Sequence, residues 1–375
     1  MRIQSIETLR LGEVAAVRIR TDDGAEGIGQ TSPFGAEITV HVLHTMVAPF
    51  FLGKDPWDLE ALVSTTLREQ YKFPSTFVLR ALTGIDTALW DLLGKVTGQP
   101  VHKLIGGAYR SSIPVYASSM SRSNSPEAEG ERLQRLAAEQ GFRAAKIRVG
   151  SPMGFDVDAS AKRTERLIPH IRSVMGDDFD ILADANSGFT APRAIRVGRL
   201  LDEHGYFHFE EPCAFDDFDR TAEVAAALDI PVAGGEQDNS LKQFKRMIDE
   251  RVVDIVQPDV GYIGGISRAR QVAIMADIAG IPCTPHSSGN SMLRVFTAHL
   301  AASMPACRQY QEWGIEQSGW ERVPIYEPML EVVDGEVAVP TTPGWGVELV
   351  PSFVTRADRA TSRADGMAVA VGMPR

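Results

Sequence analysis

The segment DILADAN (180–186) is the most informative guide to the fold, because its pattern recurs in YFHFEEP (206–212) and PVAGGE (231–236). Each stretch is a short apolar run that leads into an acidic residue, and a longer amphipathic segment precedes the next one. Short strands that alternate with helices are typical of parallel sheets. The three stretches therefore predict successive β/α units, which end on the acidic residues Asp184, Glu210 and Glu236.

The same alternation extends in both directions from these units. The further strand candidates are IPVYASS (113–119), AAKIRVG (144–150), DIVQPD (254–259), PCTPHS (282–287) and QYQEW (309–313). The segments between them are amphipathic, as an outer ring of helices requires. Eight strands with seven helical connections indicate a parallel α/β barrel, and a doubly wound open sheet is the alternative.

The chain divides into three parts. Residues 1–111 have strand-like alternation followed by long helical patterns, which predicts an α+β domain. Residues 112–327 carry the barrel pattern. In residues 328–375 the segment DGEVAVP (334–340) is again strand-like, and we expect it to lead the chain back to the first domain. The sequence after Val354 gives no clear signal of structure.

The composition excludes several classes of protein. A net charge of −11 and a pI near 5.3 argue against binding to nucleic acid, whose partners present clustered Lys and Arg. Three cysteines without a close CxxC pair indicate neither a disulfide framework nor a zinc site. The first residues do not resemble a signal peptide, and no apolar run is long enough for a membrane span. We therefore expect a cytoplasmic protein that does not bind membranes.

A polar residue stands at the end of each of the last six strand candidates. The spacings between these residues are 26, 26, 23, 27 and 26, which is about the length of one β/α unit and predicts that they surround one mouth of the barrel. The alternative is that these polar residues simply end strands or cap helices. That explanation is plausible for any one of them, but it would have to hold for all six at once. The six residues are Asp184, Glu210, Glu236, Asp259, His286 and Glu312.

The first three of these residues suit a metal ion. Three carboxylates at one mouth repel one another unless a cation joins them, and an all-oxygen set favours Mg²⁺, or Mn²⁺, over zinc. We therefore predict a metal site at Asp184, Glu210 and Glu236. Asn186 follows Asp184 by two residues and should support the metal site or contact the substrate.

Asp259 and His286 lie on adjacent strand candidates and can form a catalytic dyad. A carboxylate that accepts a hydrogen bond from one imidazole nitrogen fixes the tautomer and raises the basicity of the other nitrogen. This arrangement predicts that His286 acts as a general acid and base. The pair His204 and His208 lacks such a partner, and we interpret both residues as structural.

Lys146 and Arg148 stand two apart on one strand candidate, so both should face the barrel interior. Two cations opposite a divalent metal would bind a substrate carboxylate and stabilise the enediolate that forms when the adjacent C–H loses its proton. Ordinary inward ion pairs with the acidic residues are the alternative.

Taken together, these motifs resemble the enolase superfamily, and within it the mandelate racemase subgroup. The resemblance covers nearly the whole chain and rests on the order of its motifs: TDDGAEGIGQ (21–30), GIDTALWDLLGK (84–95), ADAN (183–186), FEEP (209–212), GGE (234–236), QPDVGYIGG (257–265), TPHSSGNS (284–291) and PTTPGWGV (340–347). It implies an α+β capping domain over a modified (β/α)7β TIM-type barrel, and Mg²⁺ that stabilises an enediolate formed from a small anionic carboxylate substrate. It also implies a homo-oligomer.

The resemblance implies a role for each matching residue. The metal ligands carry over to Asp184, Glu210 and Glu236, and the acid/base dyad carries over to Asp259 and His286. Glu312 matches an acid that hydrogen-bonds the substrate or the enolate, and Glu316 is a weaker match for that role. Lys146 matches the lysine that stabilises the enolate.

Arg148 departs from the pattern of the subgroup, because many members have a second lysine there that acts as a base. Arginine stays protonated at any working pH and is a poor proton acceptor. Racemisation needs proton transfer on both faces of the α-carbon, whereas elimination of water needs one base and one acid, and His286 can supply both. We therefore predict dehydration of a sugar acid, an aldonate or an aldarate. An isomerase (an epimerase, racemase or cycloisomerase) and a non-catalytic ligand-binding barrel are the alternatives.

The link between the first two strands, RLGEVAA (10–16), is short where many relatives carry a long specificity loop. Substrate selection should then fall to other segments of the cap, with Phe34, Tyr71 and Lys72 as candidate substrate contacts. The segment GSPMGFDVD (150–158) is a candidate lid over the mouth.

Overall fold

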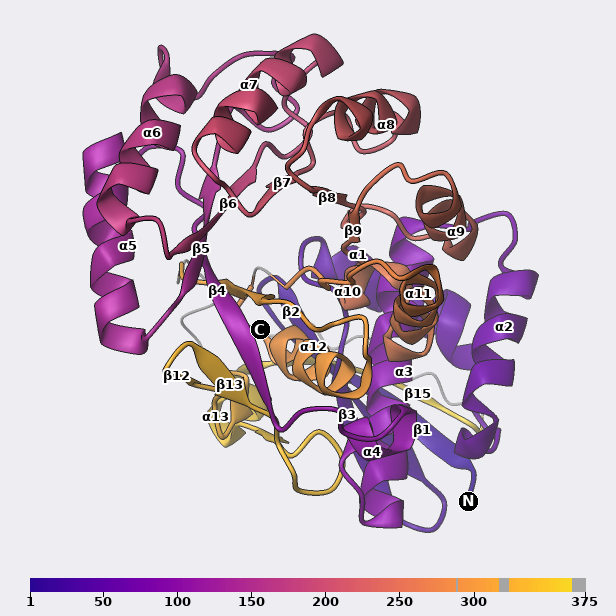
Figure 1. Cartoon of the computed structure of the whole chain (residues 1–375). Coiled ribbons are helices and arrows are strands. Elements are labelled where there is room, and N and C mark those ends of the chain that lie inside the picture. The colour runs from indigo at the N-terminus through magenta and orange to yellow at the C-terminus, as the bar shows by residue number, and fades with distance from the viewer. Residues whose placement is uncertain (288, 317–323, 366–375) are drawn as a thin grey trace.

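The computed structural model describes residues 1–287, 289–316 and 324–365 (Figure 1). The chain builds a cap from its first hundred residues, continues into a barrel, and ends in a segment that contacts both. Within these described ranges, no helix is both long enough and apolar enough to cross a membrane.

The cap is an antiparallel sheet covered by helices. Its strands β1, β2 and β3 pair in sequence order, and the long helix α3 packs across β3. The elements are β1 (Ile3–Leu11), β2 (Val14–Thr21), β3 (Glu26–Gln30), α1 (Ala36–Val42), α2 (Leu59–Glu69), α3 (Thr76–Thr97) and α4 (Val101–Ile105). The helix α3 ends at Gly98, which has a φ of 67° and so provides the left-handed cap that glycine favours.

Two glycines let α3 lie directly against β3. A Cβ atom added at Gly27 would stand 2.2 Å from the carbonyl oxygen of Ala88, and one added at Gly29 would stand 2.4 Å from the backbone nitrogen of Ala88. Asp91 of α3 adds a buried tie, because its Oδ2 accepts a hydrogen bond of 2.8 Å from the backbone N–H of Ile28. The glycines of the motif TDDGAEGIGQ thus serve close backbone packing.

The barrel confirms the prediction of parallel strands alternating with helices. The strands are β4 (Ser112–Ser118), β5 (Ala144–Arg148), β6 (Asp180–Asp184), β7 (His208–Glu210), β8 (Val232–Gly234), β9 (Ile255–Val256) and β10 (Gln311–Gly314). The seventh strand candidate joins only through two isolated bridges, Val256 with Cys283 and Asp259 with His286. Because the barrel strands pair in chain order and the last of them, β10, pairs in parallel with the first, β4, the sheet curls back on itself as a barrel does, and the open doubly wound sheet is wrong.

Helices connect the successive strand positions and lie outside them (Figure 1). The connecting helices are α5 (Pro126–Gln140), α6 (Arg163–Met175), α7 (Ala191–Glu203), α8 (Phe218–Ala227), α9 (Leu241–Asp249), α11 (Ile266–Ala279) and α12 (Met292–Ser303). A short additional helix, α10 (Val260–Ile263), begins directly after Asp259. The architecture is the predicted (β/α)7β barrel with an α+β cap.

The C-terminal segment contacts both domains. The strand β13 pairs antiparallel with the first residues of β4, and β15 pairs antiparallel with β1 of the cap. The elements are β11 (Tyr326–Glu327), β12 (Val332–Val333), β13 (Glu336–Ala338), β14 (Glu348–Leu349), α13 (Pro351–Arg356) and β15 (Asp358–Arg363). Strand β15 could not be predicted from the sequence, because DRATSR is polar and lacks the apolar alternation that marks a strand.

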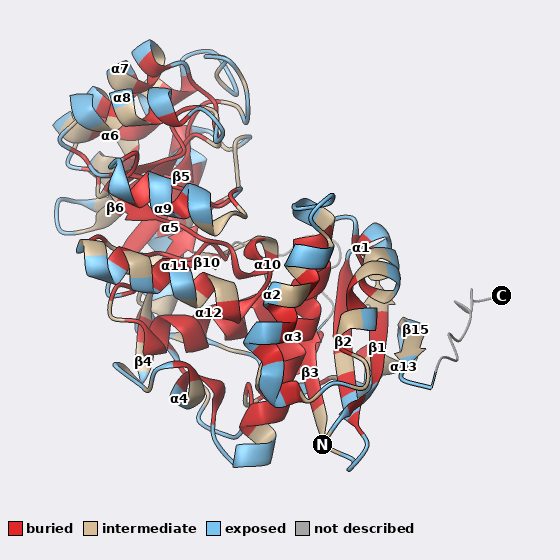
Figure 2. Ribbon diagram, turned by 90° about the vertical axis from the view of Figure 1, so that its right-hand side faces the viewer, coloured by how far each residue is buried: buried red, intermediate tan, exposed pale blue. Residues whose placement is uncertain are grey.

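Buried residues form two main groups, one inside the cap and one between the barrel strands and their helices (Figure 2). Trp345 is fully buried where cap and barrel meet, and its indole N–H donates to the carbonyl of Thr87 at 2.9 Å. The backbone N–H of Trp345 donates to Oδ1 of Asp91 at 2.8 Å. The turn PTTPGWGV therefore fixes the position of α3 against the barrel.

Candidate active site

The register of the parallel strands brings the predicted site residues to one end of the barrel. Arg148 lies opposite Asp184, and Asp184 lies opposite Glu210 in the neighbouring strand. Asp259 and His286 face each other across an isolated bridge. All of these residues stand at the carboxyl ends of their strands, where the active sites of β/α barrels lie.

Lys146 is fully buried and contacts three carboxylates. Its Nζ atom lies 2.5 Å from Oε1 of Glu210, 2.9 Å from Oε1 of Glu312 and 3.3 Å from Oδ2 of Asp184. Burial lowers the pKa of Lys146, but Glu210 and Glu312 outweigh this effect, and the net pKa is raised. Lys146 is therefore a permanent cation and a hydrogen-bond donor.

Arg148 forms an ion pair with Asp184 and donates to Oδ1 of Asn186 at 3.0 Å. Its Nε also donates to the carbonyl of Ser119 at 3.0 Å, so the guanidinium is held by groups from two strands. The backbone N–H of Asn186 donates to Oδ1 of Asp184 at 2.7 Å. Asn186 is thus part of the predicted cluster, bound to both Arg148 and Asp184.

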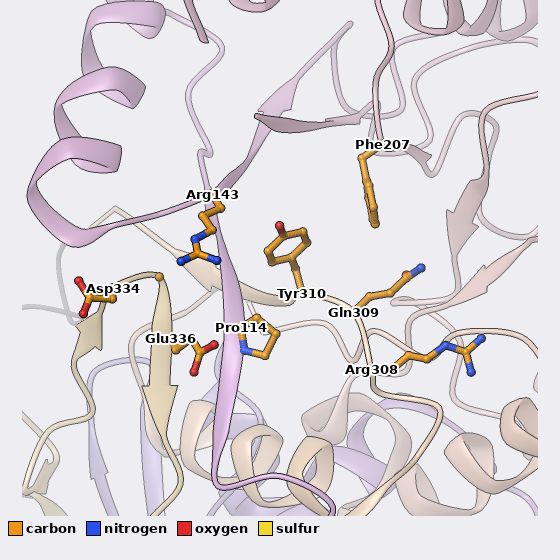
Figure 3. Close-up of a pocket in the computed structure, with 9 residues that line it drawn as sticks. Pro114, Arg143, Phe207, Arg308, Gln309, Tyr310, Asp334 and Glu336 are labelled. Atoms are coloured by element: carbon orange, nitrogen blue, oxygen red, sulfur yellow. The ribbon is translucent and has the colours of Figure 1, made fainter. Parts of the chain in front are cut away.

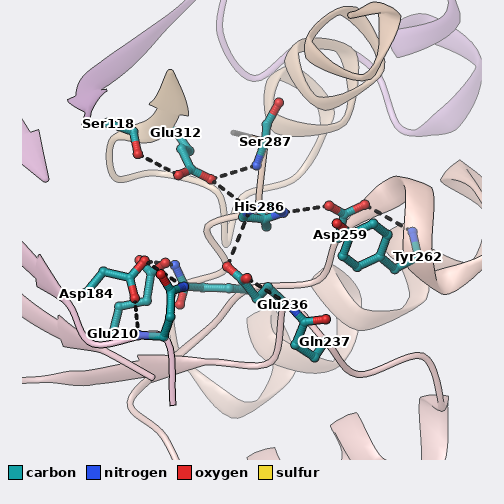
Figure 4. Close-up of polar contacts among 12 residues, drawn as sticks. Ser118, Asp184, Glu210, Glu236, Gln237, Asp259, Tyr262, His286, Ser287 and Glu312 are labelled. Carbon is teal, nitrogen blue, oxygen red and sulfur yellow. Dashed lines mark hydrogen bonds and ion pairs between the residues drawn. The ribbon is translucent and has the colours of Figure 1, made fainter. Parts of the chain in front are cut away.

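His286 lies between carboxylates on both sides of its ring (Figure 4). Its Nδ1 is 2.6 Å from Oδ2 of Asp259, and because a carboxylate only accepts, Nδ1 carries a proton. Its Nε2 is 3.4 Å from Glu236 and 3.6 Å from Glu312. Burial lowers the pKa of His286, but Glu236, Glu312 and Asp259 outweigh burial and raise it to about 10. With that pKa the ring carries a proton on each nitrogen at neutral pH, and because Asp259 holds Nδ1, the proton on Nε2 is the one that can be exchanged.

Glu312 links Lys146 to the histidine. It accepts hydrogen bonds from Oγ of Ser118 at 2.7 Å and from the backbone N–H of Ser287 at 2.9 Å (Figure 4). Burial raises the pKa of Glu312, but Lys146 and His286 outweigh it and lower the pKa to about 2. Glu316, the weaker candidate, lies beyond the strand and pairs with Arg132 at 2.8 Å instead.

Each of the three predicted metal ligands contacts a cationic side chain. Asp184 and Glu210 face Lys146, whereas Glu236 faces His286. Among the residues that the structure describes, no group of three or more His, Cys, Asp or Glu side chains converges tightly enough to hold a metal ion.

The donor set nevertheless suits a hard cation, since all three predicted ligands offer carboxylate oxygens. The neighbouring residue Glu211 shows the effect of the negative charge that these carboxylates carry. Its buried Oε1 has no hydrogen-bond partner, and burial, Glu236 and Glu210 raise the pKa of Glu211 well above its usual value. A divalent ion would offset this charge.

Three residues directly after the strand ends have left-handed backbones. They are Asn186, Ser187 and Glu211, with φ of 42°, 59° and 41°. Residues other than glycine are strained in the left-handed region of backbone conformation, and such strain is concentrated at functional sites. Backbone hydrogen bonds hold the conformation; Ser187 N, for example, donates to the carbonyl of Glu211 at 2.8 Å.

The predicted contacts from the cap do not touch this cluster in the structure. Phe34 is 58% exposed and Tyr71 is 69% exposed, and Lys72 lies over the ring of Tyr71 with its Nζ 5.8 Å from the centroid. The cap instead reaches the dyad through a pair that the sequence did not reveal. Arg80 of α3 stacks on Tyr262 at 3.9 Å, and the Tyr262 ring lies 6.1 Å from that of His286.

The candidate lid at residues 150–158 is ordered by its own turn. Met153, Phe155 and Asp156 have positive φ, and backbone hydrogen bonds tie the segment to the loop after β6, including Met153 N to the carbonyl of Asn186 at 3.0 Å. Phe155 is 81% exposed. The lid role remains a prediction.

A different pocket, of about 370 Å³, lies at the opposite end of the barrel (Figure 3). It is lined by residues at or just before the starts of strands, including Pro114, Arg143, Phe207 and Tyr310. Phe207 and Tyr310 meet edge to face, with centroids 5.9 Å apart. The catalytic residues of β/α barrels lie at the carboxyl ends of the strands, whereas this pocket lies at their amino ends. The pocket is therefore separate from the candidate active site.

Family models match both domains of the chain. Residues 2–106 match the mandelate racemase / muconate lactonizing enzyme N-terminal domain, and residues 128–353 match the enolase C-terminal domain-like family. Among curated proteins, the chain is 31% identical over 337 residues to the arabinonate dehydratase of Saccharolobus solfataricus, covering 89% of this chain and 87% of the relative.

Two solved structures are similar over nearly their whole length. A "putative racemase" from Roseobacter denitrificans is 45% identical, with a TM-score of 0.94 and coverage of 97% of this chain and 100% of that one. A mandelate racemase/muconate lactonizing protein from Paracoccus denitrificans PD1222, complexed with magnesium, is 30% identical, with a TM-score of 0.88 and coverage of 98% and 99%.

Proposed function

This chain belongs to the mandelate racemase branch of the enolase superfamily, and on that premise we propose that it dehydrates a sugar acid through an enediolate intermediate. The observation that carries the proposal is the asymmetry of the mouth. One side presents His286, held by Asp259 at 2.6 Å, and the other presents Arg148, which is tied to Asp184 and Asn186. His286 can transfer protons, whereas Arg148 stays protonated and cannot act as a second base, and this combination suits elimination.

Asp184, Glu210 and Glu236 would hold Mg²⁺, with Mn²⁺ as a possible substitute of the same ligand preference. The support is the set of carboxylate donors, the unpartnered oxygen of Glu211 beside them, and the relative from Paracoccus that was solved with magnesium. When bound, the ion would polarise the substrate carboxylate and stabilise the negative charge that develops on it.

His286 would remove the proton from the carbon next to the substrate carboxylate. Asp259 keeps a proton on Nδ1, so Nε2 is the atom that exchanges a proton with the substrate. A cation held by Glu236 would offset the carboxylate charge that raises the pKa of His286, and Nε2 could then accept the proton. Lys146, fully buried among carboxylates, would donate to an oxygen of the enediolate. Glu312 fixes the position of Lys146 and also lies 3.6 Å from Nε2 of His286.

The same imidazolium would then return its proton to the β-hydroxyl, which leaves as water. The C–H and C–O bonds break, a C=C bond forms, and the resulting enol rearranges to a 2-keto-3-deoxy acid. The proton taken from the α-carbon leaves in the water molecule, so no oxidant or further reactant is required. Arg148 cannot serve as a second base, which disfavours racemisation at the α-carbon.

The proposal is tested with a panel of aldonic and aldaric acids in the presence of Mg²⁺, followed by detection of 2-keto-3-deoxy acids. We expect at least one member to be converted, and the His286→Asn variant to be inactive on it. Protein that binds Mg²⁺ and converts no acid, or a His286→Asn variant with full activity, would contradict the proposal.

Isomerisation is the second candidate, because the relative with 45% identity bears the name of a racemase. Proton NMR in deuterated water separates the two reactions. Solvent deuterium in a product with the composition of the substrate supports isomerisation, whereas loss of water supports dehydration.

A homo-oligomer and a cytoplasmic location remain predictions. Light scattering on the purified protein would measure the oligomeric state, and cell fractionation would measure the location.

A further inference from the structure

A second arginine reaches the mouth of the barrel from a loop that the sequence did not single out. Arg122 follows β4 and is half-buried. Its NH2 donates to Oδ1 of Asn186 at 2.7 Å, and its Nε donates to the carbonyl of Gly150 at 3.1 Å. Since Arg148 donates to the same Asn186 oxygen at 3.0 Å, one neutral oxygen joins two guanidinium groups.

Among the described residues, no carboxylate balances the positive charge of Arg122. Within the described part of the chain, Arg122 has no ion pair, and its NH1 atom has no hydrogen-bond partner. Arg148 has one anionic partner, Asp184. Burial first, and then Arg148 and Arg163, lower the pKa of Arg122 to about 9, as expected where like charges face one another.

Arg163 shows what a purely structural arginine looks like in this region. It is almost fully buried, and its three nitrogens donate to the backbone carbonyls of Asn124, Arg148 and Ser121 at 3.1, 2.8 and 3.3 Å. All of its donor nitrogens are used, and they fix the loop that carries Arg122. Arg122 differs, because it is partly exposed and keeps a terminal nitrogen unused.

We propose that Arg122 forms a subsite for a second carboxylate, so that the sugar acid is a diacid (an aldarate) rather than an aldonate. This inference rests on the proposed dehydration and names the substrate class of the same site. A planar guanidinium with a free N–H edge binds carboxylate with charge-assisted hydrogen bonds. An aldonate would place a neutral hydroxymethyl group there and leave the cation unpaired.

The test compares aldarates with aldonates that share every carbinol configuration and differ only at the terminal carbon. We expect wild-type enzyme to have the higher kcat/KM for the diacid. Arg122→Met should lower the ratio of diacid to monoacid kcat/KM by about 10- to 100-fold, chiefly through KM, and Arg122→Lys should lower it less. The control is Arg196→Met, at an exposed position of α7.

A wild-type preference for monoacids, or an Arg122→Met variant that loses activity equally on both acids, would overturn the subsite. Calorimetry with His286→Asn protein measures binding of the diacid without turnover, so it tests the subsite independently of the proposed reaction. In that background, Arg122→Met should weaken diacid binding by about 10- to 100-fold even if no acid is dehydrated. Unchanged diacid affinity, or no diacid binding in either protein, counts against the subsite.

Discussion

Replacement of Asp259 with asparagine should abolish most of the activity and leave the fold intact. Oδ1 of Asp259 caps α10 by accepting hydrogen bonds from Gly261 N at 2.6 Å and Tyr262 N at 3.0 Å. Oδ2 accepts from Nδ1 of His286 at 2.6 Å. In Asp259→Asn the amide oxygen can keep both cap contacts, but the amide nitrogen then faces Nδ1 and can only donate.

The proton of the neutral imidazole would therefore move to Nε2, the atom that must accept the substrate proton. Loss of a positioned general base lowers kcat by about 10²- to 10⁴-fold, and we expect Asp259→Asn to fall in that range. Asp259→Ala should lose the cap as well, which destabilises the protein by about 0.5–2 kcal/mol.

The assay measures three quantities on the same protein: formation of 2-keto-3-deoxy acid, the melting temperature, and the His286 tautomer by ¹⁵N NMR. Asp217→Asn is a matched control, since Asp217 caps α8 through Arg220 N at 3.2 Å and has no histidine partner. If Asp259→Asn kept kcat within threefold of wild type, or if Nδ1 stayed protonated, the assigned role of Asp259 would be wrong.

Three further predictions concern the metal, the cap and acid stability. Chelation of divalent ions should abolish activity and added Mg²⁺ should restore it; full activity in protein shown by elemental analysis to lack metal would contradict this. Gly29→Ala should lower the free energy of unfolding by about 1–3 kcal/mol in urea titrations, because the added Cβ would lie 2.4 Å from α3. Gly234→Ala is the control and should change the free energy of unfolding little, because the nearest atom to its Cβ would be 3.5 Å away. Burial, and to a smaller extent His102, lower the pKa of His299 to about 3. The same histidine in the unfolded chain has a pKa of about 6.5, so as the pH falls below about 6.5 the unfolded chain takes up a proton before the folded protein does, and the folded protein loses stability. Between pH 7.5 and 5.5 this histidine should destabilise the fold by about 1 kcal/mol, and His299→Gln should flatten the pH dependence of unfolding; an unchanged slope would refute the assignment.

Sequence patterns were sufficient for the barrel and for the end of the barrel that carries the chemistry. A strand and its helix form a local unit, so the regular spacing of Asp184, Glu210 and Glu236 follows from the length of that unit. The alternation of side chains along a strand likewise placed Lys146 and Arg148 on one inward face. The structure has both residues buried at that mouth.

Contacts between loops and between distant segments could not be predicted in this way. Arg122 meets Asn186 across 64 residues, and no periodic signal marks either partner of that contact. Arg80 reaches Tyr262 only because α3 packs on the barrel, and β15 joins β1 although its residues are polar. Which carboxylates contact Lys146 was also decided by packing.

Local patterns were enough to predict a parallel barrel with a cap and a ring of carboxylates beside one histidine, because strand and helix periodicity and the β/α repeat are local properties of the chain. Which charges are balanced at the mouth became visible only in the folded structure. That balance depends on distances between loops from different units, and it left the Arg122 cation without an acidic partner among the described residues.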